Sequence, residues 1–71
     1  MRAYGCAMTS LSAQLSAITS SLEELTTRVA GLADEQYRLK AEQVAVDLEE
    51  AERSLRAGVR RLERLLRTLP R

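Results

Sequence analysis

Three pairs of neighbouring carboxylates are the residues with the clearest capacity for acid–base chemistry. They are Glu23/Glu24, Asp34/Glu35 and Glu49/Glu50. A general acid and a general base must converge on one substrate to act together. Neighbouring residues of a helix point about 100° apart, so the two carboxylates of each pair diverge if these segments are helical. We therefore expect solvent-exposed acids and not catalytic dyads.

The other side chains used in catalysis and metal binding are scarce. The chain of 71 residues contains no histidine and one cysteine, Cys6. Without an imidazole there is no general base to activate the serines and threonines, and no His/Cys ligand set for zinc. Tyr37 is interpreted as a packing residue, and the three glycines are isolated and form no phosphate-binding loop. The sequence predicts that the protein is not an enzyme and binds no cofactor or metal.

A row of arginines is the strongest candidate binding feature. Six of them share one arc of roughly 80° on a helix: Arg53, Arg56, Arg60, Arg64, Arg67 and Arg71. Such a row suits an anionic partner, which would be a phosphate backbone, an acidic protein or an anionic lipid surface. No aromatic or base-reading side chains accompany it, so nucleic-acid binding would be weak and limited to the backbone. Three of the six follow an acid by four residues and the net charge is +1, which also fits a plain solvent-exposed surface.

Two series of apolar residues predict the helices that carry these groups. The first series advances in alternate steps of four and three, the heptad pattern of a packed helix. Its members are Leu11, Leu15, Ile18, Leu22, Leu25, Val29 and Leu32. The members of the second series are Tyr37, Ala41, Val44, Leu48, Ala51, Leu55, Gly58, Leu62, Leu65 and Leu69, with Val59 and Leu66 widening it. We therefore expect an all-α protein.

An offset between the two series predicts a turn between two antiparallel helices. The offset is five residues, whereas a continuous heptad helix accommodates insertions of three or four. Gly31 suits the left-handed position that ends a helix, and Asp34 suits the cap that starts the next one. We predict a helix over about 9–30, a turn over 31–34 and a helix over about 34–68. One long helix that tolerates an interior glycine is the alternative.

The predicted hairpin, residues 9–71, is expected to form a single domain. Residues 1–8 precede the apolar pattern and are expected to be a disordered extension. The second helix would outlast the first by roughly a dozen residues, at 1.5 Å per residue, and its leucine-rich end would then remain uncovered.

An aliphatic hairpin of this length cannot cover both of its apolar stripes. Aromatic residues are 3% of the chain, and two stripes facing each other stay half accessible. Charges are also segregated, with seven acids and two bases in residues 34–52, and seven arginines and one glutamate in residues 53–71. Antiparallel alignment of two second helices would pair these halves, with Ala51 and Gly58 near the crossing point. We predict a homodimer forming an antiparallel four-helix bundle or coiled coil.

The expected self-association surface consists of the large apolar members of both series. They are Leu11, Leu15, Ile18, Leu22, Leu25, Val29, Leu32, Val44, Leu48, Leu55, Val59, Leu62, Leu65, Leu66 and Leu69. The expected partner is the protein itself, and the alternative is a different protein whose helices fill the same surface.

Function and location follow from the same features. We expect a small, non-enzymatic structural or protein-interaction module, and the alternative function is binding of nucleic acid or an anionic surface through the arginines. No apolar run approaches the length needed to span a bilayer. One unpaired cysteine and the lack of a signal-peptide pattern favour a cytoplasmic location.

Overall fold

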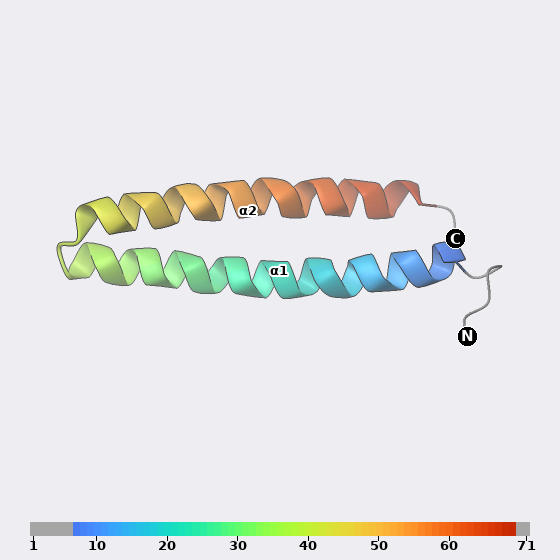
Figure 1. Cartoon of the computed structure of the whole chain (residues 1–71), viewed down its shortest axis with the longest axis horizontal. Helices are drawn as coiled ribbons and strands as arrows, with labels where there is room; N and C mark the ends of the chain where they lie inside the picture. Colours follow the sequence, from blue (N-terminus) through green and yellow to red (C-terminus); the bar gives the residue numbers. More distant parts are fainter. Residues whose placement is uncertain (1–6, 70–71) are drawn as a thin grey trace.

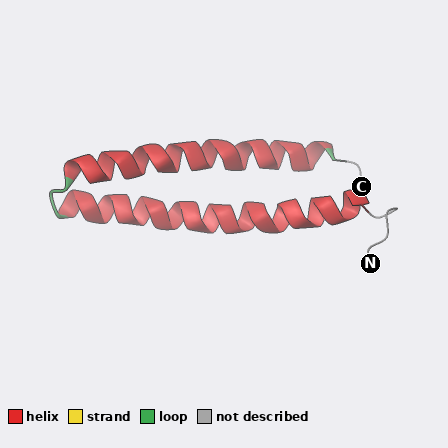
Figure 2. Cartoon of the chain, in the orientation of Figure 1, coloured by secondary structure: helices red, strands yellow, loops and turns green. Residues whose placement is uncertain are grey.

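Two long helices joined by a short turn make up the described chain (Figure 1). The computed structural model describes residues 7–69, with side chains from residue 10 onward. Helix α1 spans Ala7–Arg38 and helix α2 spans Glu42–Thr68. The helices lie side by side and antiparallel, and the described part of the chain contains no strand (Figure 2). The predicted all-α helical hairpin is confirmed.

Small side chains form the contact between the two helices. The buried residues of α1 are Thr19, Thr26 and Ala33, which repeat every seven residues, and those of α2 are Ala45 and Val59. Each threonine hydroxyl donates a hydrogen bond to the carbonyl oxygen four residues earlier, at 2.7 Å for Thr19 and 2.6 Å for Thr26. Because this bond satisfies the hydroxyl within α1, the threonine can be buried against α2 without an unpaired polar atom. The buried core of one hairpin is therefore thin.

The turn between the helices consists of Leu39–Ala41. Lys40 has a φ of 65° and occupies the left-handed position that ends α1. The N–H of Lys40 donates to the carbonyl oxygen of Tyr37 at 3.1 Å, and the N–H of Ala41 donates to that of Gln36 at 2.9 Å. These two bonds define a Schellman motif, in which glycine is the most common left-handed residue. A lysine in this position carries a conformational cost that glycine would not.

The predicted turn at residues 31–34, and the helix boundaries on both sides of it, were wrong. Gly31 lies inside α1 without a positive φ, and no neighbouring atom lies within 4 Å of the place of a Cβ. The contact series runs past it in register, from Thr26 to Ala33. Packing along this series outweighs the cost of an interior glycine, which is about 1 kcal/mol. The five-residue offset between the apolar series is absorbed at Leu39–Ala41 instead.

The helices are also closer in length than predicted. Helix α1 has 32 residues and α2 has 27, so α1 runs beside α2 to its C-terminal end (Figure 1). Val59 belongs to the end of the second helix that was expected to remain uncovered, but it is buried with 6% of its surface exposed. Ala7 and Met8 were assigned to a disordered extension, but they form the first turn of α1. The rest of that extension, residues 1–6, lies outside the described residues, as does Cys6.

The position of the turn determines whether each of two substitutions raises or lowers the free energy of unfolding. Gly31→Ala removes a flexible residue from a helix interior, so we expect the free energy of unfolding to rise by about 0.5–1 kcal/mol. Lys40→Gly relieves the left-handed conformation, so we expect a rise on the order of 1 kcal/mol. Urea denaturation followed by circular dichroism measures both changes. A turn at Gly31 would make both substitutions destabilising.

Candidate interaction surfaces

An exposed row of large apolar side chains runs along each helix. The row on α1 repeats every seven residues with exposed fractions between 40% and 49%, and consists of Leu11, Ile18, Leu25 and Leu32. On α2, Val44 and Leu65 are 50% and 43% exposed, and Ala51 and Gly58 continue the seven-residue spacing between them. We call these two rows, together with the half-buried apolar residues between them, the apolar face. The half-buried residues are Leu15, Leu22, Val29, Leu48, Leu55 and Leu62. Exposed apolar side chains that form a contiguous patch typically mark a site where another molecule binds.

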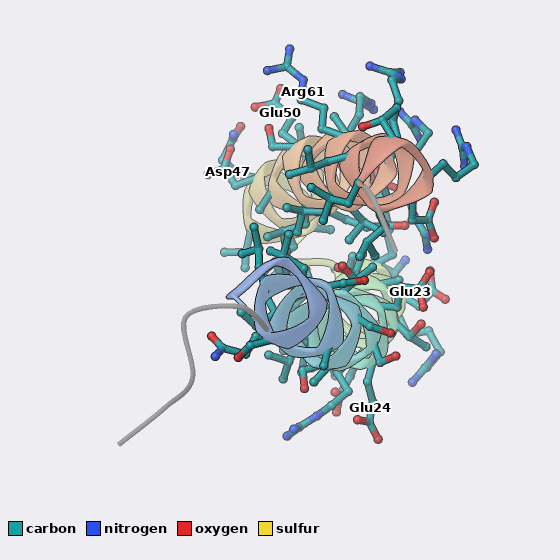
Figure 3. The ribbon with its side chains drawn as sticks, turned by 90° about the vertical axis from the view of Figure 1, so that its right-hand side faces the viewer. Glu23, Glu24, Asp47, Glu50 and Arg61 are labelled. Atoms are coloured by element: carbon teal, nitrogen blue, oxygen red, sulfur yellow. The ribbon has the colours of Figure 1, made fainter. Side chains whose placement is uncertain are left out.

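Both rows lie on the same side of the hairpin. In α1 each exposed residue of the row from Ile18 onward comes directly before a buried one, as Ile18 precedes Thr19. The same order holds in α2, where Val44 precedes Ala45. A step of one residue back from the contact line turns the side chain by about 100° around the helix axis. Because the helices are antiparallel, this step leads to the same side of the hairpin in both helices. Glu23, which lies four residues after Thr19, projects from the opposite side of the hairpin in the end-on view of Figure 3.

The residues predicted for self-association fall into three groups in the hairpin. The exposed ones are Leu11, Ile18, Leu25, Leu32, Val44 and Leu65. The half-buried ones are Leu15, Leu22, Val29, Leu48, Leu55, Leu62, Leu66 and Leu69. Val59 alone among them is buried. The two predicted series therefore do not close on each other, because each helix is rotated so that a neighbouring series makes the contact.

The contact series of α1 was missed in the sequence. Its members belong to a pattern of small residues spaced by seven that starts at Ser12 and continues through Thr19, Thr26 and Ala33. Serine, threonine and alanine carry little weight when a helical period is sought among large apolar residues. Small residues at the same period were the available signal, since the distance between packed helices depends on the side chains at the contact.

Arginines cover the outer surface of the second half of α2. All six arginines between residues 53 and 67 are exposed, and Arg53, Arg60 and Arg67 repeat every seven residues. This row lies about 160° around α2 from the row that contains Val44, and so on the side away from the apolar face. Arg56 forms an ion pair with Glu52 at 2.7 Å, and no other ion pair occurs within residues 10–69. Arg71, which belongs to the predicted row, lies outside the described residues.

A shallow cleft of about 280 Å³ separates the helices on the side opposite the apolar face. Its lining residues are Glu23, Thr26, Thr27, Arg56, Val59, Arg60 and Glu63. A hydrogen bond with Glu63 raises the pKa of Glu23, and desolvation and the charge of Glu63 act in the same direction. The neighbouring Glu24 points away from α2 (Figure 3). The raised pKa of Glu23 therefore reflects its contact with Glu63 of the other helix, and the two carboxylates repel each other once Glu23 is ionised.

Tyr37 joins the helices on the same side, close to the turn. Its hydroxyl donates a hydrogen bond to Oε1 of Glu49 at 2.9 Å, and this bond is the main reason that the pKa of Tyr37 is raised. Tyr37 was expected to begin the apolar series of the second helix. It lies instead in the last turns of α1, because the turn follows it.

Comparison with models of protein families, with curated proteins and with solved structures finds no match. Within residues 7–69, no group of three or more His, Cys, Asp or Glu residues is placed to hold a metal ion. Neither α1 nor α2 contains a stretch of sufficient length and apolarity to cross a membrane. The apolar face and the arginine row are therefore the features from which function must be inferred.

The carboxyl pair between the helices predicts a pH dependence of stability. Because the pKa of Glu23 is higher in the folded chain, the folded state binds more protons, and the free energy of unfolding falls as pH rises above the ordinary glutamate pKa of about 4.3. Glu23→Gln should retain a hydrogen bond to Glu63 without titrating, so we expect a higher melting temperature near neutral pH and a flatter pH profile. Thermal melts by circular dichroism measure this. Glu24→Gln is the matched control, and an equal effect of both substitutions would contradict the assignment.

Proposed function

We propose that this protein is a self-associating helical module in which a second copy covers the apolar face, so that two hairpins form a four-helix bundle. The observation that carries the proposal is the exposure of the row on α1, where large side chains leave 40–49% of their surface in water. Among residues 10–69, the hairpin buries only three apolar side chains, those of Ala33, Ala45 and Val59. Since burial of apolar surface contributes roughly 25 cal/mol per Å², covering this face would stabilise the chain in proportion to the apolar area removed from water.

A second copy fits the apolar face in shape and in charge. Two parallel rows of heptad spacing are best covered by two further helices with the same spacing, as in a four-helix bundle. Helix α2 carries five acids and no base between residues 42 and 52, and six arginines and one glutamate between residues 53 and 68. Hairpins turned end to end would place each acidic half against a basic half.

The proposed role is structural, namely to hold two chains together and to present their charged outer surfaces to other molecules. A non-enzymatic role is supported by the divergence of neighbouring carboxylates, which Glu23 and Glu24 illustrate in Figure 3. It is also supported by the absence of histidine from the sequence.

Leu25→Lys tests the proposal at the centre of the apolar face. We expect it to weaken self-association on the order of a hundredfold, because the lost burial and the introduced charge occur once in each copy. Ser20→Lys is the matched control, since Ser20 is exposed and lies about 140° around α1 from Leu25. Light scattering coupled to size-exclusion chromatography should give twice the chain mass for the wild type and for Ser20→Lys.

Two results would contradict self-association. The first is a folded wild-type protein with the mass of one chain. The second is an isolated chain that is largely unfolded or aggregated, because the helices of a different protein would then be needed to cover the apolar face.

A second candidate function is the binding of nucleic acid through the arginines of α2. It is favoured by the position of Arg53, Arg60 and Arg67 on the side away from the apolar face, where self-association would leave them accessible. Guanidinium groups spaced along a helix can neutralise successive phosphates, and binding of this type is insensitive to base sequence and weakens steeply with salt.

An electrophoretic mobility shift with random-sequence duplex DNA tests this second function. We expect retardation at low salt that is lost near physiological salt, and a triple substitution of Arg53, Arg60 and Arg67 by Gln should abolish it while the protein keeps its mass in solution. Unchanged DNA mobility at low salt would rule this function out.

A further inference from the structure

We propose that the second copy binds antiparallel to the first, with α2 packed on α2 and α1 packed on α1; this inference rests on the proposed self-association. Two hairpins stacked on their apolar faces have a second possible alignment, in which α1 of each copy packs on α2 of the other. Both alignments bury the same residues and both fit the heptad register, so charge must distinguish them.

The heptad register lets the like-on-like alignment run along the whole hairpin. Within one hairpin, residues at equal height have numbers that add up to about 80, as Arg38 and Glu42 do on either side of the turn. The half-buried row consists of Leu15, Leu22 and Val29 in α1 and of Leu48, Leu55 and Leu62 in α2. Antiparallel packing sets this row of a helix against the exposed row of the same helix in the second copy. The residue numbers of two facing residues then add up to about 113 in α2 and about 47 in α1. Half of each sum, about 56 and about 24, lies at one height near the middle of both helices. One two-fold axis therefore serves α1 and α2 together.

Large side chains then face small ones at the centre of α2. Leu55 lies opposite Gly58 of the second copy and Leu62 opposite Ala51 of the second copy, and each pair occurs twice by symmetry. In the single hairpin, apart from the chain neighbours of Gly58 and the backbone of α2 itself, no atom lies within 4 Å of the place of a Cβ on Gly58, so the space above it is available to a leucine. The centre of the α2 pair is thereby filled without crowding.

Charges along the outer edge of the apolar face favour this alignment over the other. The edge residues, spaced by seven, are Gln14, Ser21, Arg28 and Glu35 on α1 and Asp47, Ser54 and Arg61 on α2. Asp47 and Arg61 extend outward from α2 in Figure 3. The like-on-like alignment sets Arg61 beside Ser54 and brings no like charges together on this edge. Packing of α1 on α2 would instead place Glu35 beside Asp47 twice and would gather both acidic halves of α2 at one end, which is unfavourable.

Cross-linking of single-cysteine variants distinguishes the two alignments. All variants carry Cys6→Ser, and each experiment mixes two of them in equal amounts before treatment with a short bismaleimide. A mixture of Ser54→Cys and Arg61→Cys should give several-fold more covalent dimer than either variant alone, because these positions lie side by side in the proposed alignment. A mixture of Ser21→Cys and Arg61→Cys is the matched control and should give no such increase.

Each other outcome overturns the inference in a recognisable way. An increase only for the mixture with Ser21→Cys would establish packing of α1 on α2. No increase in either mixture, with a dimeric mass retained, would refute both alignments and leave self-association intact. A single-chain mass for the wild type would refute self-association itself.

Discussion

The close contact between α1 and α2 through small side chains is the constraint on which the rest of the molecule depends. Thr19, Thr26 and Ala33 occupy the contact line of α1, where a leucine would hold the helices further apart. The threonines are accepted there because their hydroxyl groups bond to carbonyl oxygens of α1 itself. The large apolar residues must then lie beside the contact line, and in both helices they lie on the same side of it.

This displacement gives the hairpin two different sides. One side carries the exposed leucines, isoleucine and valine of the apolar face. The other side carries the Glu23–Glu63 pair, the hydrogen bond from Tyr37 to Glu49, and the neighbouring arginines. Polar groups on the second side remain in contact with water, whereas the first side has no comparable polar cover. Self-association through the apolar face would therefore leave the charged side available to other molecules, and the two proposed activities do not compete for one surface.

The helices and their antiparallel arrangement could be predicted because large apolar residues repeat with an unbroken heptad period and because the two series are out of register. The site of the turn could not be predicted from the same information. Gly31 has the residue type of a helix end, but packing of Thr26 and Ala33 keeps α1 continuous across it. Lys40 has no such signature, yet it adopts the left-handed conformation because the contact series of α1 ends and that of α2 begins on either side of it. At both positions, packing between the helices outweighs the local conformational preference of the residue.

The apolar residues of the candidate surface were predicted as one self-association set, and in the hairpin this set divides into exposed, half-buried and buried members. A heptad pattern states that residues such as Leu25 and Val44 share a face, and does not state whether the partner of that face is the other helix or another chain. Thr19 and Thr26, which hydropathy patterns pass over, show that α2 contacts α1 along a different line of residues. The arginine row was predicted from spacing alone, since exposed charges depend little on tertiary packing.

The most direct test of the central claim, that a second copy covers the apolar face, is the melting temperature measured over a wide range of chain concentrations. If folding and self-association are coupled, mass action requires the melting temperature to rise steadily as the chain concentration increases. A cooperative transition at one temperature across the whole range, with helicity retained at the lowest concentration, would show that a single hairpin is stable with its leucines in water and would contradict the account.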